Sequence, residues 1–502
     1  MAIMKMNKIL LINPPWNIFF NQEGSYAPLG LCCIAAVLEK KGYNTKIFNC
    51  DLTSDNFRLT SLKTMNDSKD SFADCVDKEK HPIWQEIRKC LKEESPDIIG
   101  ISVLTSKHTI ALKIAVIAKS INPNMKIIFG GVHPSILPDE ALKEVVVDYV
   151  VRGEGEETIL ELLNALENDA EIDGIKGVSF RKNGAIVHNE DRDLVKCLDD
   201  LGFPARHLIM NSEEMAPIHF GRIFATRGCP YSCIFCSAHK IWTRKVRYRT
   251  PENVVDEMIL MKAKHGTRLF IFDDDSFTIN RKYIEKLCGL LKEKCSNIFW
   301  RCETRADLVD DKIIKTMKKA GCVSISVGAE SGNNEILKKI KKGVTVEQIK
   351  KAVSIIKQNG IMVNVFFMLG FPWETEREIN DTLALMKDLR PDGEVGAVYS
   401  LVTPYYGTEL YKECEDMKVL PSNKKWDSYY HQNAEIHLCK GINKDRYTDL
   451  VVEAGKIFDE YNRFNRIKML LKPRFLLLSI QQRKYFSVNK LILLVKYLFK
   501  KK

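Results

Sequence analysis

The sequence predicts an α/β protein with an N-terminal doubly wound parallel sheet, a partial (β/α)6 barrel and a mostly helical C-terminal region. Residues 1–165 and 216–410 both alternate short apolar runs with amphipathic segments of helical period, which is typical of parallel α/β folds. Residues 166–215 are expected to connect these domains, and the alternation stops at residues 411–502. A chain of 502 residues, 45% apolar and 28% charged, is long enough for two or three domains.

The first domain is expected to be an open parallel sheet. Apolar runs predict strands, and segments of helical period predict helices at 29–41 and 110–120. Open α/β sheets bind ligands at the carboxyl ends of their strands. The predicted strands are 8–13, 45–49, 97–103, 126–129 and 148–151.

The strand ends of this domain carry glycines and prolines but no dinucleotide fingerprint. No Gly-x-Gly-x-x-Gly follows the first strand, so a dinucleotide site is not expected. The adjacent Gly130 and Gly131 allow a backbone to approach a flat, bulky group closely. Each of these segments alone could be an ordinary turn. The others are Asn13-Pro14-Pro15, Pro28-Leu29-Gly30, Ser102-Val103-Leu104 and Arg152-Gly153-Glu154.

The second domain is expected to be an incomplete barrel of six β/α units. In parallel barrels the chemistry takes place at the carboxyl ends of the strands. Within the connector, Asn183-Gly184 lies between short apolar runs and predicts a hairpin over 178–189. The barrel strands are predicted at 222–226, 268–272, 298–302, 323–327, 361–367 and 395–401.

Three cysteines directly follow the first barrel strand. Cys229, Cys233 and Cys236 have the spacing Cys-x3-Cys-x2-Cys, which places three thiolates in one tight loop. Thiolates are the usual ligands of iron–sulfur clusters, and three of them leave one iron of a 4Fe–4S cluster open. A structural zinc loop is the alternative. Zinc requires four protein ligands, and only His239 has a suitable local spacing.

The distribution of charge indicates which partners the protein is expected to have. The net charge of +11 arises from the tail, because residues 463–502 hold twelve Lys or Arg and no Asp or Glu. We therefore expect no nucleic-acid groove. The tail is expected either to lie at an anionic membrane surface or to form a helical cap with a solvated basic face.

Fifteen cysteines without scaffold spacing, and no signal-peptide pattern, favour a cytoplasmic protein.

The cysteine loop, with Phe235 before its last cysteine, resembles that of radical S-adenosylmethionine (SAM) enzymes. The resemblance implies that SAM fills the open iron position and is cleaved to a 5′-deoxyadenosyl radical. It also implies SAM contacts at the other strand ends: Asp274 to the ammonium group, Arg305 to the carboxylate, Glu330 to the ribose hydroxyls, and Gly370-Phe371-Pro372 beside the adenine.

The first domain resembles the cobalamin-binding domain that precedes many radical SAM enzymes, through Ser102-Val103-Leu104 followed by Gly130-Gly131. The Asp-x-His-x-x-Gly element that supplies a histidine below the cobalt is absent. Cobalamin is therefore expected without an imidazole ligand, and His133 is interpreted as a wall residue rather than as that ligand. The implied cofactor contacts are Pro28, Gly30, Ser102, Leu104, Gly130, Gly131, His133, Gly153 and Glu154.

The order of the two domains is that of cobalamin-dependent radical SAM enzymes. Residues 229–242 followed by 247–251, and residues 275–282, are similar to the anaerobic magnesium-protoporphyrin IX monomethyl ester cyclase branch. Methylthiotransferases carry three further cluster cysteines, an arrangement not found here.

The resemblance implies methylation of an unactivated carbon or phosphorus centre, with methylcobalamin as the methyl donor. The alternatives are cobalamin-dependent oxidation, ring closure or rearrangement without methyl transfer, and a cobalamin-sensing scaffold. The expected partners are a small-molecule or lipid-like substrate and an external electron donor of the flavodoxin or ferredoxin type.

Overall fold

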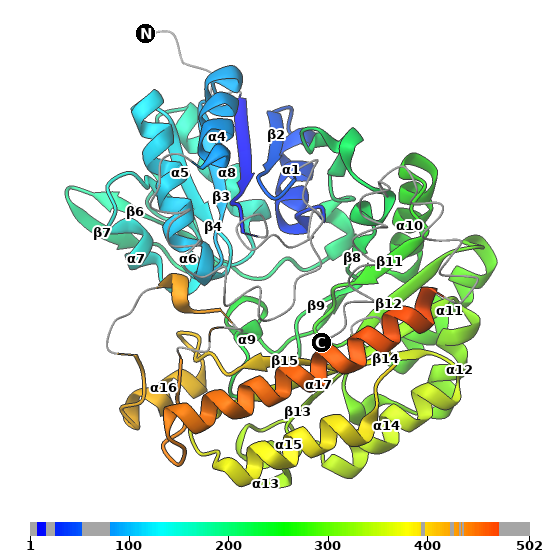
Figure 1. Cartoon of the computed structure of the whole chain (residues 1–502). Helices are drawn as coiled ribbons and strands as arrows, with labels where there is room; N and C mark the ends of the chain where they lie inside the picture. The colour runs from blue at the N-terminus through cyan, green and yellow to red at the C-terminus, as the bar shows by residue number, and fades with distance from the viewer. Residues whose placement is uncertain are drawn as a thin grey trace. The chain divides into compact units, whose positions relative to one another are not determined.

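The structure is a computed structural model, shown in Figure 1. It describes residues 8–16, 26–52, 81–392, 397–421, 426–430, 433 and 436–470, with the side chains of the last helix through Tyr461. The chain forms two compact units. Unit 1 comprises Met1–Met215, Lys240–Trp242 and Lys425–Asp427, and unit 2 comprises the remainder.

Unit 1 contains a seven-stranded sheet in the order β2-β1-β3-β4-β5-β6-β7. The first five strands are parallel, and β1 lies between β2 and β3, so the chain reverses its direction of winding there. This confirms the predicted doubly wound sheet and puts the topological switch point beside β1. The strands are β1 (Lys8–Asn13), β2 (Asn44–Asn49), β3 (Ile98–Ser102), β4 (Lys126–Gly130), β5 (Tyr149–Val151), β6 (Val178–Lys182) and β7 (Ala185–His188).

The predicted hairpin is present but extends this sheet. Strands β6 and β7 are antiparallel and are joined by Asn183 and Gly184, which have φ values of +51° and +82°. Two residues with positive φ form the turn whose twist suits a two-residue hairpin. Because β6 also pairs with β5, the stretch expected to be a connector contributes two strands to the first sheet.

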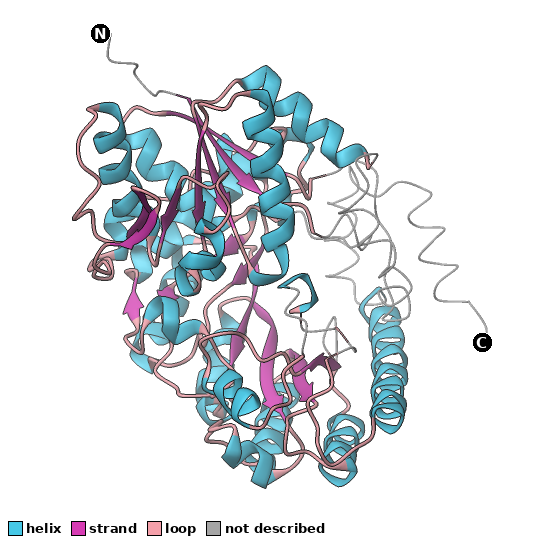
Figure 2. Ribbon diagram, turned by 90° about the vertical axis from the view of Figure 1, so that its left-hand side faces the viewer, coloured by secondary structure: helices cyan, strands magenta, loops and turns pink. Residues whose placement is uncertain are grey.

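Helices flank the strands of this sheet (Figure 2), and α4 and α5 pack together on it, as do α1 and α8. The central strands β1, β3 and β4 are apolar and almost fully buried, as expected for a sheet with both faces covered. The helices are α1 (Leu29–Lys40), α4 (Pro82–Glu94), α5 (His108–Ile121), α6 (Val132–Ile136), α7 (Pro138–Leu142) and α8 (Gly155–Glu167).

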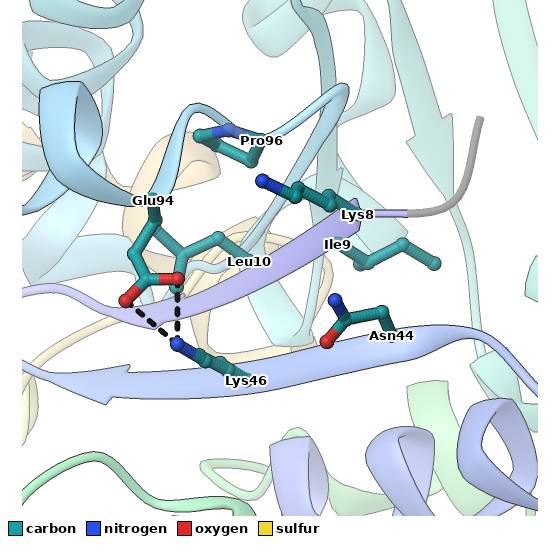
Figure 3. A pocket seen from close by; sticks show the side chains of 7 residues that line it. All are labelled: Lys8, Ile9, Leu10, Asn44, Lys46, Glu94 and Pro96. Atoms are coloured by element: carbon teal, nitrogen blue, oxygen red, sulfur yellow. Dashed lines mark hydrogen bonds and ion pairs between the residues drawn. The ribbon is translucent and has the colours of Figure 1, made fainter.

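A small polar depression lies at the amino ends of β1 and β2 (Figure 3). Its walls include Lys8 and Asn44, the first residues of these strands, and the Lys46–Glu94 ion pair at 2.8 Å spans it. This edge is opposite to the carboxyl ends where open α/β sheets bind ligands. The depression therefore lies away from the expected ligand site.

Unit 2 contains six parallel strands in the order β15-β14-β13-β12-β11-β8, with helices between consecutive strands. The predicted partial barrel of six units is confirmed. Its strands are β8 (Arg222–Ile223), β11 (Leu269–Phe272), β12 (Phe299–Thr304), β13 (Cys322–Glu330), β14 (Met362–Leu369) and β15 (Ala397–Leu401). Its main helices are α10 (Pro251–His265), α11 (Arg281–Lys294), α12 (Asp311–Lys319), α14 (Val346–Gln358) and α15 (Glu376–Leu389).

The first barrel strand is shorter than predicted. Strand β8 ends at Ile223, and the chain then forms β9 (Thr226–Arg227), which pairs antiparallel with β10 (Arg247–Tyr248). The Asp274 carboxylate at the end of β11 accepts hydrogen bonds from the backbone of Ala225 and the side chain of Thr226. These bonds hold the segment between β8 and β9 to the end of β11, directly before the cysteine loop begins.

The C-terminal region is mostly helical, as predicted. It includes α16 (Glu409–Asp416) and α17 (Lys444–Leu470), and α17 packs against α15 and β15 (Figure 1). Helix α17 takes in the first part of the basic tail, and residues 471–502 lie outside the described residues. None of the helices within the described part of the chain is both long and apolar enough to cross a bilayer.

A buried ion pair stabilises the segment after the cysteine loop. Arg249 and Glu257 are 2.5 Å apart with side chains 1% and 0% exposed, and Arg249 also bonds the Phe224 carbonyl at 3.0 Å. We expect Arg249→Met to destabilise unit 2 by about 3–5 kcal/mol, because it removes the Arg249 cation from a fully buried ion pair. Denaturant unfolding followed by circular dichroism measures this cost.

The matched control is Lys315→Met, which breaks the exposed Lys315–Asp311 pair and should cost less than about 1 kcal/mol. The double variant Arg249→Met/Glu257→Leu should recover part of the loss. Equal stability of wild type and Arg249→Met would show that the buried pair contributes nothing.

Candidate active site

The cysteine loop lies between β9 and α9 (Ala238–Trp242), and its three thiols are half-buried. The backbone N–H groups of Tyr231 and Ala238 donate to the sulfurs of Cys229 and Cys236, respectively. Hydrogen bonds to thiolates are among the interactions that tune iron–sulfur clusters. Three accessible thiols in one loop, two of them already accepting backbone bonds, fit a cluster with one open iron.

The centre of this loop is fastened to the rest of unit 2 by Ile234. Its N–H donates to the Ile340 carbonyl at 3.1 Å, and its carbonyl accepts from the Leu410 N–H at 3.0 Å. Ile234 is 1% exposed, so its apolar side chain anchors the loop as well. The cysteines are thus presented on a loop that the barrel and the C-terminal region both hold.

The zinc alternative gains no support from the loop geometry. Within the described residues, no three His, Cys, Asp or Glu side chains are grouped closely enough to hold a single metal ion. The His239 ring hydrogen-bonds through Nδ1 with the Cys236 carbonyl at 3.1 Å. In a cluster each thiolate binds a different iron, so the ligands need not converge on one point.

The three acidic residues after β11, Asp273, Asp274 and Asp275, have different surroundings. Asp273 forms a bidentate pair with Arg222 at 2.6 and 2.8 Å. Asp274 is 2% exposed and accepts hydrogen bonds from Ala225 and Thr226, and burial raises its pKa to about 7. Both oxygens of Asp274 are engaged by this backbone and side chain, so its contact with SAM stays a prediction that competes with Asp275.

Asp275 is the exposed carboxylate of this run, and it has no hydrogen-bond partner among the described residues. Burial raises the pKa of the Cys229 and Cys236 thiols, and the negative charge of Asp275 adds to both shifts. The Asp275 carboxylate therefore lies within electrostatic range of two of the cluster cysteines. The sequence showed three adjacent acids but not which of them faced the cysteines.

Arg305 lies against the cysteine loop. Its guanidinium stacks on the Tyr231 ring at 3.6 Å from the centroid, and it is 6% exposed. Nε and Nη2 form a bidentate pair with Asp307 at 2.9 and 3.2 Å, which leaves Nη1 for another acceptor. Arg305, the predicted contact of the SAM carboxylate, thus lies against the cysteine loop, and its Nη1 is outside the ion pair with Asp307.

Glu330 ends β13 in an unusual backbone conformation. Its φ is +64°, and the β13–β14 register shifts between Gly328 and Glu330. Its Oε1 pairs with Lys342 Nζ at 2.5 Å, and a Cβ on Gly328 would lie 2.4 Å from that oxygen. Such strain at a strand end is typical of functional sites. Lys342 was not expected, since nothing in its local sequence distinguishes it from its lysine neighbours.

The loop after β14 is built around a buried carboxylate that the sequence analysis missed. Glu374 Oε2 accepts hydrogen bonds from the N–H groups of Gly370 and Phe371, both at 2.8 Å. Burial raises the pKa of Glu374 to about 7. The Phe371 ring lies 6.3 Å from the Phe235 ring, so the predicted adenine loop contacts the cysteine loop.

Glu303 adds a further carboxylate at the strand ends of the barrel. Burial, followed by the charges of Asp273 and Glu330, raises its pKa to about 7. Its side chain is accessible to solvent and has no direct partner among the residues described. A carboxylate that titrates near neutral pH at the barrel mouth is a candidate for contact with substrate. The sequence feature that could have identified Glu303 is its position near the carboxyl end of β12, where the chemistry of parallel barrels takes place.

In unit 1 the predicted cobalamin segments meet at the ends of β3 and β4. Gly131 has a φ of +96°, and a Cβ there would lie 3.0 Å from the Val103 nitrogen and 3.3 Å from Ser102 Oγ. Leu104 is 48% exposed, which is unusual for a leucine beside a buried strand. Close backbone approach with an exposed apolar side chain fits a large, flat ligand such as cobalamin.

His133 is buried beneath this surface. It is 1% exposed, and its ring centroid lies 4.4 Å from that of His108 and 5.3 Å from that of Trp426. Burial, followed by the charge of His108, lowers the pKa of His133 to about 3. The ring is thus enclosed by neighbouring aromatic side chains, and its interpretation as a wall residue stays a prediction.

The remaining predicted cobalamin contacts are placed as follows. The Pro28 carbonyl accepts from the Cys32 N–H at 3.0 Å, and Gly30 lies in the first turn of α1. Gly153 N donates to Ser135 Oγ at 2.9 Å. Glu154 is 5% exposed and accepts from the Val195 N–H at 2.7 Å, so its carboxylate holds the chain that follows β7.

A buried polar network occupies the strand ends at the switch point. Lys107 Nζ lies 3.2 Å from Asn13 Oδ1, 2.8 Å from the Pro14 carbonyl and 3.7 Å from Asp51. Asn13 in turn donates to Asn49 Oδ1 at 2.8 Å. An amine, two amides and a carboxylate thus lie together at the carboxyl ends of β1 and β2.

Comparison with known proteins identifies both domains of the chain. Residues 223–386 match the model of the radical SAM superfamily, and residues 18–163 match that of the B12 binding domain. An uncharacterized methyltransferase of Pyrococcus horikoshii is 32% identical over 413 residues, which are 82% of this chain and 83% of the relative. The chain belongs to the cobalamin-binding radical SAM enzymes. As predicted, this enzyme uses a 4Fe–4S cluster, SAM and cobalamin.

Other members of this family are similar over most of the chain. The anaerobic magnesium-protoporphyrin IX monomethyl ester cyclase of Rubrivivax gelatinosus is 28% identical, covering 82% of this chain and 70% of the relative. The solved structure of the radical SAM methyltransferase TsrM from Kitasatospora setae, with cobalamin and a [4Fe-4S] cluster bound, aligns with a TM-score of 0.67. It shares 16% identity and covers 90% of this chain and 89% of its own, which shows the shared fold.

The division of roles between Asp274 and Asp275 is testable. We expect Asp275→Asn to keep about four irons per chain but to bind SAM roughly 10- to 100-fold more weakly, because a hydrogen bond to a charged group is lost. We expect Asp274→Ala to lose iron, because the entry to the cysteine loop is released. Iron analysis and equilibrium dialysis with SAM measure both effects.

The opposite pattern would restore Asp274 as the SAM contact. In that case Asp274→Ala would retain its iron and lose SAM affinity, while Asp275→Asn would bind SAM as the wild type does.

Proposed function

We propose that the enzyme methylates an unactivated carbon or phosphorus centre of a small molecule. The observation that carries the proposal is the three-cysteine loop, together with the polar groups at four strand ends of the same barrel that we propose as SAM contacts. The 32% identical relative is described as an uncharacterized methyltransferase, and the match covers 83% of its length. This similarity supports methyl transfer. The cofactors supply the radical and the methyl group, and the chain supplies their orientation and a site closed to water.

The proposed SAM contacts follow from the free atoms at these strand ends. Asp275 accepts from the ammonium group in place of Asp274, and Arg305 Nη1 donates to the carboxylate. Glu330 Oε2 accepts from the ribose hydroxyls, while Lys342 holds Oε1. The Gly370–Pro372 loop flanks the adenine, and Phe235 supports it from the cysteine loop.

Cobalamin is proposed to lie on the carboxyl edge of the sheet in unit 1, on the surface formed by Ser102, Leu104, Gly130 and Gly131. The Lys107 network and the enclosed His133 are consistent with a cobalt that receives no imidazole from the protein. Buried amides and an amine at that edge can hydrogen-bond to the amide groups of the corrin ring.

Ring closure or oxidation without methyl transfer is the second candidate. It is favoured by the 28% identity to a relative described as a magnesium-protoporphyrin IX monomethyl ester cyclase, over 82% of this chain. In either reaction Glu303 is proposed to bind a polar group of the substrate, since it is the accessible carboxylate beside Asp273 and Glu330.

Two partners complete the proposal. Reduction of the cluster requires an external electron donor, for which a flavodoxin or a ferredoxin is suited. The basic tail, residues 463–502, is proposed to contact an anionic membrane surface, which would suit a lipid-like substrate.

Labelling of the SAM methyl group distinguishes the two reactions. Enzyme reconstituted with cluster and cobalamin is incubated under reductant with trideuteromethyl SAM and a metabolite extract of its host. We expect a small-molecule product that carries the trideuteromethyl group, with 5′-deoxyadenosine formed alongside it, and mass spectrometry detects both.

Deoxyadenosine with a changed but unlabelled metabolite would contradict methylation and favour the cyclase-type reaction. A protein that binds cobalamin but never cleaves SAM would contradict both and favour a sensing scaffold.

A further inference from the structure

We propose that Glu374 and the C-terminal segment Ile436–Tyr447 form a clamp that positions the Gly370–Pro372 loop for SAM binding. Glu374 is the positioning residue of this clamp and acts through the backbone of the loop. The inference rests on the proposed function, because it takes Gly370–Pro372 as the loop that flanks the adenine.

The inner side of the clamp is a single carboxylate oxygen. Glu374 is 0% exposed, and its Oε2 receives the N–H groups of two consecutive residues, Gly370 and Phe371, at 2.8 Å each. Successive N–H groups that converge on one anion fix the backbone conformation between them. The conformation of the Gly370–Pro372 loop therefore depends on the Glu374 carboxylate, because an apolar side chain at this position would accept neither hydrogen bond.

The second oxygen of Glu374 distinguishes this residue from ordinary packing. Oε1 is buried without a hydrogen-bond partner among the described residues. Burial of a carboxylate with one unpaired oxygen is costly, and an apolar side chain of similar size would avoid that cost. The residue is consistent with selection for the two backbone bonds rather than for stability.

The outer side of the clamp is the C-terminal segment. The Tyr447 hydroxyl lies against Gly370, where a Cβ would be 2.4 Å from it, and it donates to the Leu369 carbonyl at 3.4 Å. Cys439 Sγ lies 3.2 Å from the Phe371 carbonyl, and Lys440 N donates to the Pro372 carbonyl at 3.3 Å. Four consecutive residues of the loop region are thus contacted from behind.

The loop transmits this positioning to the cluster side through aromatic rings. The Phe371 ring lies 6.3 Å from Phe235 of the cysteine loop and is stacked with Trp373 at 6.1 Å. Phe371 is 0% exposed, so it cannot move without moving its neighbours. Release of the loop backbone would therefore shift the surface offered to the adenine while leaving the cysteines in place.

The test compares three substitutions at one position in the full-length, cluster-reconstituted enzyme, with SAM itself as the probe. Glu374→Leu keeps the volume but leaves both N–H groups unpaired, and we expect SAM to bind at least 10-fold more weakly at an unchanged iron content. Glu374→Gln keeps an acceptor oxygen and should recover most of that affinity. Equilibrium dialysis gives the affinity, and the electron paramagnetic resonance spectrum of the reduced cluster reports whether SAM reaches it.

A matched control lies on the same helix as Tyr447. Glu453→Gln breaks the exposed Lys387–Glu453 ion pair and should leave SAM affinity unchanged. If Glu374→Leu loses its cluster, Glu374→Asp carries the test, since its shorter carboxylate cannot bond both N–H groups and should bind SAM several-fold more weakly at full iron content.

Wild-type SAM affinity in Glu374→Leu or, failing that, in Glu374→Asp would overturn the proposal. A Glu374→Gln variant as weak as Glu374→Leu would overturn it as well. Failure of the proposed function looks different, because the wild-type enzyme would then cleave SAM without forming a methylated product, or would not cleave SAM at all.

Discussion

The site depends on the hydrogen bonds that Asp274 accepts from Ala225 and Thr226. They fasten the chain to the end of β11 between β8, which ends at Ile223, and β9, directly before the loop that carries the three cysteines. The carboxylate lies at the end of the neighbouring strand and is 2% exposed. A buried acid thus connects the closure of the barrel to the place where the cluster is held.

The other strand ends share one arrangement. At each of them, one residue forms an internal bond while a neighbouring group keeps an atom outside that bond. Asp274 is enclosed while Asp275 is exposed, and Asp307 holds Arg305 by two nitrogens and leaves a third. Lys342 takes one oxygen of Glu330 and leaves the other. Each free atom is therefore oriented by a partner before any ligand arrives, which reduces the entropy lost on binding.

Much of this could be predicted from the sequence because periodicity and strand ends are local properties. The alternation of apolar runs and helical segments gave both sheets, and cysteine spacing gave the cluster loop. The choice between Asp274 and Asp275 could not be made, because adjacent acids differ only in the direction their side chains take in the fold. Lys342, Glu374 and Lys107 were missed for a related reason, since each acts on a segment brought near it by the fold. The hairpin at Asn183-Gly184 was recognised from its turn, but its pairing with β5 is a long-range contact that no local pattern encodes.

The central claim is that Cys229, Cys233 and Cys236 hold a 4Fe–4S cluster whose open iron binds SAM. The most direct measurement is the electron paramagnetic resonance spectrum of the reduced, reconstituted enzyme with and without SAM, together with its iron content. The account predicts about four irons per chain, a spectrum that changes when SAM is added, and loss of both in the triple Cys→Ala variant with cobalamin binding retained. A spectrum indifferent to SAM, or a triple variant that keeps its iron, would contradict it.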